Sequence, residues 1–402
     1  MTARSCQDDG CASAGPGRAP ARQRALTGLL LAGVLALAGC SSFSSFSFWP
    51  WGSTVKIPDP PAVTAPVAAR QAWSTRLGPA GLGFAPVFAA GSVFAASSDG
   101  AVARIDAETG RVAWRVDAGK RLSSGVGSDG DTTVVAARDG SLIAFDGQGR
   151  QRWSAQLGGE AVTVPAVGMG LVVVRASDNR LTAFEADTGK RRWSFQRQNP
   201  SLVLRQTAGV AIAPDAVYAG MPGGRLVSLS LQTGALRWEG TVSQPKGATE
   251  IERIADVVGS PLVSGRTVCA ASFQGKVACF DTQSGRPQWS RDVSSSAGID
   301  IDASLLAVVD DRDHVHAFSR SGASLWRQEG LSGRGVSAPL SLGPVLVLGD
   351  SLGLVYLLSR SDGAVAGRFA TDGSALVSPP VAAGRTAVVQ TSAGALVGIS
   401  LD

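Results

Sequence analysis

Tryptophan recurs along this chain at intervals of about forty residues, and in six segments it stands four residues after a glycine. Upstream of most of these segments, a turn pair such as Asp99-Gly100 or Asp139-Gly140 separates two runs rich in Val and Ala. Such pairs tolerate the positive φ of tight hairpin turns, so each unit supplies four short antiparallel strands. Four strands per unit of about forty residues are typical of a β-propeller blade. The six segments are Gly110–Trp114, Gly149–Trp153, Gly189–Trp193, Gly234–Trp238, Gly285–Trp289 and Gly322–Trp326.

The blade count follows from the two ends of the repeat region. A seventh copy keeps Gly363 but has Gly367 in place of tryptophan, and Phe369, two residues on, is a candidate to fill the gap because it lies on the same strand face. Residues 379–400 supply three strands of an eighth copy, and the segment around Trp73 offers the fourth. The sequence therefore predicts an all-β, eight-bladed β-propeller over residues 70–402, with four antiparallel strands per blade and a last blade closed by N- and C-terminal strands.

The charge of the chain is low and dispersed. The formal net charge is +5, and Lys and Arg are scattered rather than gathered into a basic stripe. Nucleic-acid binding needs such a stripe, so we exclude it.

The amino terminus has the features of an export signal. Arg18, Arg22 and Arg24 precede an apolar stretch, Leu26 to Ala38, that is too short to span a bilayer. The ending "LAGC" resembles a bacterial lipoprotein box, which predicts a signal peptide over 1–39 and lipidation of Cys40; an uncleaved signal anchor is the alternative. By the same resemblance, Ser41 rather than Asp after the cysteine indicates the outer membrane, facing the periplasm.

Residues 40–69 contain the lipidated cysteine and a Ser- and Pro-rich segment without a sustained period, which predicts a flexible tether. The propeller is expected to follow directly after this segment.

Two successive units are longer than the others. Trp153 and Trp193 are 40 residues apart, but Trp193 and Trp238 are 45 apart, and Trp238 and Trp289 are 51 apart. The extra residues follow the fourth strand, so both insertions lie on one face of a propeller, in adjacent blades. They bring Leu202, Leu204 and Arg205 near Glu250, Glu252, Arg253 and Asp256, and apolar side chains flanked by charges are typical of a partner-binding surface.

The repeat resembles that of the eight-bladed quinoprotein dehydrogenases, which bind pyrroloquinoline quinone. That resemblance concerns the fold more than the function. The family's enzymes carry a calcium site, a catalytic Asp and usually two adjacent cysteines, whereas no two cysteines are adjacent here. We expect no catalytic residue and no cofactor, and we keep a quinone- or sugar-binding oxidoreductase that uses the central channel as the alternative.

The whole arrangement resembles the BamB family, the propeller lipoproteins of the β-barrel assembly (BAM) complex. Two segments carry the resemblance, "PSLVLRQ" from Pro200 to Gln206 and "GATEIERIADVVGSPLV" from Gly247 to Val263. The resemblance implies a non-catalytic scaffold that binds a POTRA domain of the BamA insertase and assists the folding and insertion of outer-membrane β-barrel proteins, whose unfolded chains are further possible partners.

The residues that the resemblance carries over as BamA contacts are Leu202, Leu204, Arg205 and Asp256, with Glu250, Glu252 and Arg253 as secondary candidates. Val258 stands where the family pattern has an acidic residue, which puts a polar contact there in doubt. The alternative for Leu202 and Leu204 is that they extend the first strand of the fourth blade into the core.

Two smaller patterns complete the candidates. Cys269 and Cys279 flank the turn at Gln274-Gly275; a cross-strand disulfide requires their Cα atoms to lie within about 5.5 Å, and two buried thiols are the alternative. His314 and His316 share a strand face, a spacing that suits a metal, but no Cys or further His lies nearby. We therefore expect surface histidines and no metal site.

Overall fold

The computed structural model describes residues 57–204 and 208–401. The predicted signal peptide, Cys40 with most of the predicted tether, and Arg205 lie outside the described residues. Within the described ranges all regular structure is β-strand, and no helix is long and apolar enough to cross a membrane.

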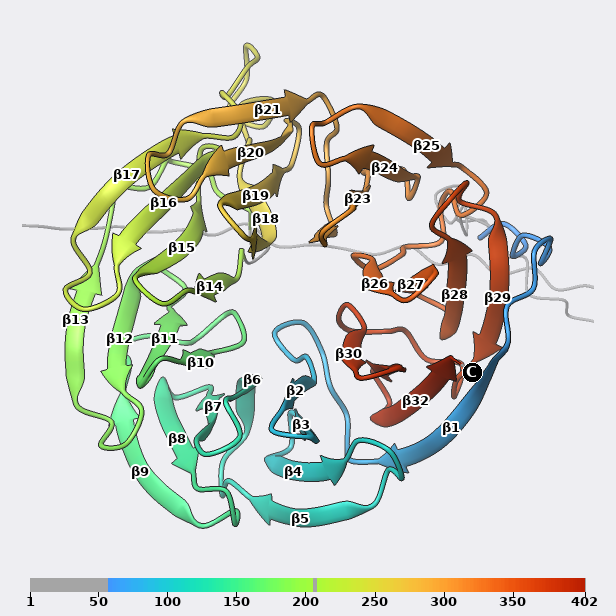
Figure 1. Ribbon diagram of the computed structural model, residues 1–402. Helices are drawn as coiled ribbons and strands as arrows, with labels where there is room; N and C mark the ends of the chain where they lie inside the picture. The colour runs from blue at the N-terminus through green and yellow to red at the C-terminus, as the bar shows by residue number, and fades with distance from the viewer. Residues whose placement is uncertain (1–56, 205–207, 402) are drawn as a thin grey trace, which may run out of the picture. The chain divides into compact units, whose positions relative to one another are not determined.

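The strands of the compact unit over residues 56–402 form eight four-stranded antiparallel sheets arranged as blades around a centre (Figure 1). Blade one contains β2 (Val87–Ala89), β3 (Ser92–Ala96), β4 (Ala101–Asp106) and β5 (Val112–Asp117). Blade two contains β6 (Leu122–Ser128), β7 (Thr133–Ala137), β8 (Ser141–Phe145) and β9 (Gln151–Gln156). Blade three contains β10 (Ala166–Gly168), β11 (Leu171–Arg175), β12 (Leu181–Glu185) and β13 (Arg191–Phe195). Blade four contains β14 (Val210–Ile212), β15 (Ala216–Met221), β16 (Arg225–Ser230) and β17 (Leu236–Thr241).

The second half of the unit repeats this pattern. Blade five contains β18 (Val257–Ser264), β19 (Thr267–Ser272), β20 (Val277–Asp281) and β21 (Pro287–Arg291). Blade six contains β22 (Gly298–Ile301), β23 (Leu305–Val309), β24 (Val315–Ser319) and β25 (Ser324–Gln328). Blade seven contains β26 (Leu340–Leu342), β27 (Val345–Gly349), β28 (Leu354–Ser359) and β29 (Val365–Ala370). Blade eight contains β30 (Val381–Ala383), β31 (Thr386–Gln390), β32 (Ala395–Leu401) and β1 (Ala69–Arg76).

Blade eight closes the ring as predicted. Its strand order is β1-β32-β31-β30, and β1 pairs antiparallel with β32 over most of its length. Because the first and last strands share one sheet, the eight-bladed prediction is confirmed, including the closure by both ends of the chain (Figure 1).

Burial explains the strand sequences. The second and third strands of a blade lie between neighbouring blades and are buried on both faces, so β7 and β8 are buried throughout. The outermost strand has one face toward solvent, and β9 alternates exposed polar residues with partly or fully buried ones.

The recurring tryptophan joins one blade to the next in every blade except the seventh. The ring of Trp153 in blade two lies against Gly189 of blade three, and its Nε1–H donates to the carbonyl oxygen of Ala186 at 2.7 Å. Gly189 has φ +69°, and a Cβ there would lie 2.6 Å from the Trp153 ring. The repeat therefore pairs a tryptophan with the glycine of the following blade, which explains their common spacing. Equivalent indole hydrogen bonds are made by Trp73, Trp114, Trp193, Trp238, Trp289 and Trp326.

Blade seven lacks the tryptophan for a topological reason. The glycine that receives each indole lies in the turn between the third and fourth strands of the next blade. In blade eight these strands are β32 and β1, which no turn connects. Phe369 instead packs, half buried, against the core between blades seven and eight.

The last part of the predicted tether lies along blade seven. The backbone N–H groups of Thr64 and Val67 donate to the carbonyl oxygens of Val365 and Ala366, each at 2.9 Å. The carbonyl oxygen of Pro58 accepts a hydrogen bond from Arg334, which is buried and paired with Asp350 at 2.7 Å. We call residues 57–68 the strap.

Candidate functional site

The two long connections lie side by side, as their shared position after the fourth strand predicts. One joins β13 to β14 and the other joins β17 to β18. Ser201 Oγ donates to Glu250 Oε2 at 3.0 Å, and the Leu204 N–H donates to Asp256 Oδ2 at 2.6 Å. We call residues 199–204 and 244–256 together the loop surface.

Asp256 holds the backbone of the loop surface in place through hydrogen bonds. Its side chain is buried, with 5% of the residue exposed, and its second oxygen accepts the Gly223 N–H at 2.8 Å. One carboxylate thus ties the first loop to the turn between β15 and β16. A residue this deeply buried offers little area to a partner, so its geometry is that of a positioning group rather than of the surface contact expected from the sequence.

A buried arginine lies near this carboxylate. Arg175, at the end of β11, donates to the carbonyl oxygen of Gly220 in β15, which joins blades three and four. Burial lowers the pKa of Arg175 to about 10, and the negative charge of Asp256 opposes this shift. Arg175 is therefore still a cation at neutral pH, and its positive charge attracts the buried carboxylate of Asp256.

Leu202 and Leu204 have different environments. Leu202 is 40% exposed, whereas Leu204 is half buried against the core between blades five and six. Neither belongs to β14, which begins only at Val210, so the alternative in which they extend that strand is wrong. Val258 is buried in the same core, which accommodates an apolar residue at that position.

The second loop holds its own shape. Glu252 accepts hydrogen bonds from the N–H groups of Ala248 and Thr249, at 2.8 and 3.1 Å, and these bonds lower the pKa of its carboxyl. Gly247 has φ +133°, and a Cβ there would lie 2.3 Å from Glu252 Cβ. Arg253 donates to the carbonyl oxygen of Gly247 at 3.1 Å and pairs loosely with Glu250 at 3.8 Å. The turn leaves Ile251 67% exposed, an apolar residue that is not among the contacts predicted from the sequence.

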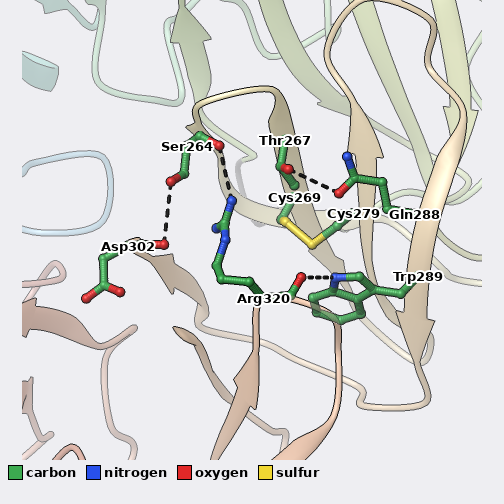
Figure 2. The surroundings of a disulfide bond; sticks show 8 residues. All are labelled: Ser264, Thr267, Cys269, Cys279, Gln288, Trp289, Asp302 and Arg320. Carbon is green, nitrogen blue, oxygen red and sulfur yellow. Dashed lines mark hydrogen bonds between the residues drawn. A yellow bond between two sulfur atoms is a disulfide. The ribbon is translucent and has the colours of Figure 1, made fainter. Parts of the chain in front are cut away.

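Cys269 and Cys279 are joined by a disulfide in the structure (Figure 2). They are directly opposite each other on β19 and β20, with Cα atoms 4.1 Å apart. Both sulfur atoms belong to the core on which Leu204 packs. The disulfide therefore reinforces the blade that carries the second loop.

His314 is buried and His316 is only partly exposed, so the expectation of two surface histidines is wrong. His314 is 8% exposed, and its Nδ1 lies 3.1 Å from Asp310 Oδ2. His316 Nε2 lies 2.9 Å from the same oxygen. Burial opposes ionisation of Asp310, but hydrogen bonds from His316 and from backbone N–H groups outweigh it and lower its pKa. No Cys or third His lies near this pair in the sequence, and the partner is instead Asp310, a residue type whose place in a turn gave no signal of a shared cluster.

Comparisons with known proteins agree with the geometry. The model of the family described as "Outer membrane protein assembly factor BamB" matches residues 65–120, 98–328 and 314–402. The "Outer membrane protein assembly factor BamB" of Bordetella pertussis is 42% identical over 374 residues, which cover 92% of this chain and 95% of that protein.

Solved structures give the same result. The crystal structure of BamB from Moraxella catarrhalis has a TM-score of 0.75 at 27% identity, covering 83% of this chain and 99% of that one. Quinohemoprotein alcohol dehydrogenase from Comamonas testosteroni has a TM-score of 0.64 at 15% identity, covering 83% of this chain and 76% of that one, a likeness of fold alone. The chain belongs to the BamB family of outer membrane protein assembly factors.

Proposed function

We propose that this chain is a non-catalytic, lipid-anchored scaffold on the periplasmic face of the outer membrane that assists assembly of β-barrel proteins by binding a POTRA domain of the BamA insertase. Membership of the BamB family supports the role in assembly. The loop surface is the single structural observation that supports the mode of binding.

The loop surface has the composition of a binding hot spot. Leu202 and Ile251 expose apolar area, and the Glu250 and Arg253 side chains lie beside them, 63% and 53% exposed. Central apolar contacts inside a charged rim typically dominate the affinity of an interface. In this proposal Leu202 and Ile251 contact the partner, and the charged pair contributes orientation.

Other residues of the surface act indirectly. Leu204 anchors the first loop on the core of blades five and six, and Asp256 holds its backbone. Arg205 stays a proposed contact on the strength of the family resemblance, as does Cys40 as the site of lipidation.

The test is recovery of partners from solubilised envelopes by affinity purification of the full chain, with mass spectrometry. The test variant is Leu202→Ala with Ile251→Ala. The matched control is Leu236→Ala with Leu325→Ala, because these leucines are 50% and 52% exposed on β17 and β25, outside the loop surface.

The parent and the control are expected to recover a POTRA-bearing insertase, and the test variant is expected to lose it while melting at an unchanged temperature. Recovery by all three would move the site elsewhere. Failure of the parent to recover any insertase would contradict the scaffold proposal.

A further inference from the structure

The turn between β23 and β24 in blade six gathers the only two histidines of the chain around one carboxylate. Asp310 follows β23, His314 precedes β24, and His316 lies within β24. One ligand atom from each residue lies within 4.8 Å of the other two. These atoms are a carboxylate oxygen and two imidazole nitrogens, a donor set that Zn²⁺ accepts.

The three side chains are held in position before any ligand arrives. Asp310 Oδ1 accepts the N–H groups of Arg312 and His314, both at 2.9 Å, which leaves Oδ2 facing the two rings. The His316 ring stacks on Phe318 with an interplanar angle of 3°. Asp310 and His314 are each 8% exposed, so little water competes for these atoms.

The cluster has too few hydrogen-bond donors for all the close polar contacts in it. Arg327 Nη2 lies 2.6 Å from His314 Nδ1, and a guanidinium can only donate. Nδ1 must therefore present its lone pair, and it then has no proton for Asp310 Oδ2, 3.1 Å away. Two lone pairs face each other at that contact, which a cation between them would relieve.

Blade seven contains the same turn, but there both carboxylate oxygens of the aspartate accept hydrogen bonds from donors. Asp350 Oδ1 accepts the N–H groups of Leu352 and Leu354, as Asp310 Oδ1 does in its own turn. Its Oδ2, however, accepts hydrogen bonds from Arg334 and from the Tyr356 hydroxyl, which supply all the protons it needs. The turn thus requires only one carboxylate oxygen, and blade six alone surrounds the other with imidazole nitrogens.

We propose that Asp310, His314 and His316 form a binding site for a divalent transition metal, with Zn²⁺ as the best match. Tetrahedral ligands at 2.0–2.1 Å from zinc lie about 3.3 Å apart, close to the separations of Asp310 Oδ2 from the two rings. Three protein ligands leave one coordination position open. The bound ion would cross-link the turn to β24.

Arg327 is the competitor for this site. Arg327 must move away from His314 when the ion binds, because the guanidinium and the metal ion both carry positive charge. Its side chain is 44% exposed and already contacts the exposed Glu329 at 3.1 Å, so an alternative position is at hand. Removal of the Arg327 charge is therefore expected to tighten metal binding, which a purely structural hydrogen-bonded cluster does not predict.

The experiment titrates the full chain, purified in detergent with a histidine-free tag, with Zn²⁺ against a chromophoric zinc indicator. A sample with ¹⁵N-labelled histidine reports the same titration by NMR, and every imidazole signal belongs to this site. One equivalent of Zn²⁺ is expected to bind and to shift both rings. His316→Gln is expected to weaken binding by more than about tenfold, and Arg327→Gln to strengthen it.

Asp311→Asn is the matched control, since Asp311 is an exposed neighbouring carboxylate outside the cluster, and it is expected to leave the affinity unchanged. No saturable binding to the parent would overturn the proposal. Binding that both His316→Gln and Arg327→Gln leave unaltered would also overturn it, because the ion would then lie elsewhere. If His316→Gln fails to fold, the direction of the Arg327→Gln effect decides.

Discussion

For single residues, the packing of one blade against the next depends on the contact between a tryptophan and a glycine. Gly189→Ala would bring a Cβ to 2.6 Å from the Trp153 ring and force alanine to φ +69°. We expect the free energy of unfolding to fall by about 2–4 kcal/mol, from strain and overpacking together. Denaturant unfolding measures this loss.

Gly170→Ala is the control, because Gly170 has φ +75° and no atom within 4 Å of the added Cβ. It retains only the backbone strain, about 1 kcal/mol. Equal losses in the two variants would contradict the role assigned to the tryptophan contact.

A second prediction for a single residue concerns the contribution of Asp256 to stability. Asp256→Ala removes the acceptor of the Leu204 and Gly223 N–H groups and the negative charge that acts on buried Arg175. We expect a loss of about 2–4 kcal/mol in unfolding free energy, because buried donors would lose a charged acceptor. Glu250→Ala, at an exposed carboxylate of the same surface, is expected to change stability by less than about 0.5 kcal/mol. A similar small change for Asp256→Ala would sink the positioning role.

The sequence indicated Asp256 and the two histidines as candidates, but it did not predict how deeply Asp256 and His314 are buried. Asp256 and His314 are polar residues in or beside turns, where sequence patterns predict exposure. Their burial depends on partners far away or in another strand, such as Leu204 for Asp256. The exposure of Ile251 depends on the tight loop that Glu252 and Gly247 form, and no hydrophobic periodicity in the sequence predicts that loop.

At the scale of elements, the disulfide between β19 and β20 supports the blade beneath the loop surface. Replacing both cysteines with alanine is expected to lower the unfolding free energy by about 2–3 kcal/mol, since the bond closes a short loop in the unfolded chain. The parent should lose the same amount when a reductant is added, and the variant should be insensitive to it. Unfolding curves that do not change with reductant would contradict this.

The strap is the second element with a testable role. Arg334→Met leaves Asp350 buried without its cation and removes the hydrogen bond to Pro58. We expect a loss of about 3–5 kcal/mol and faster proteolysis between residues 57 and 68. Arg368→Gln, which removes only longer contacts to Pro60 and Pro61, should alter both quantities much less. Unchanged proteolysis of Arg334→Met would show that the strap does not need this arginine.

The strands and the strap differ in how far the sequence predicted them. The strands follow from the glycine and tryptophan spacing, because each pair fixes the register of a whole blade. The strap lies in a Pro-rich segment without a period, and it is held through backbone groups that pair with Val365, Ala366 and Arg334. Contacts made by the backbone leave little mark on side-chain composition, so the segment was predicted only as a tether.

At the scale of the whole molecule, the sequence predicted the eight-bladed ring, including the last blade made from the first and last strands of the chain. The closed ring also explains why two insertions far apart in sequence form one surface, since adjacent blades present the same connections on the same face. The loop surface is thus a product of the ring, while its chemistry is local to Leu202, Ile251 and their charged neighbours.

The most direct measurement of the central proposal is site-specific photo-crosslinking in intact cells. A photoreactive residue would replace Leu202 or Ile251 on the loop surface, and Gln232 in the exposed turn at the opposite ends of the strands. We expect an adduct with a POTRA-bearing insertase from positions 202 and 251 and none from 232. Adducts from 232 alone, or none from the loop surface in a folded and correctly exported protein, would contradict it.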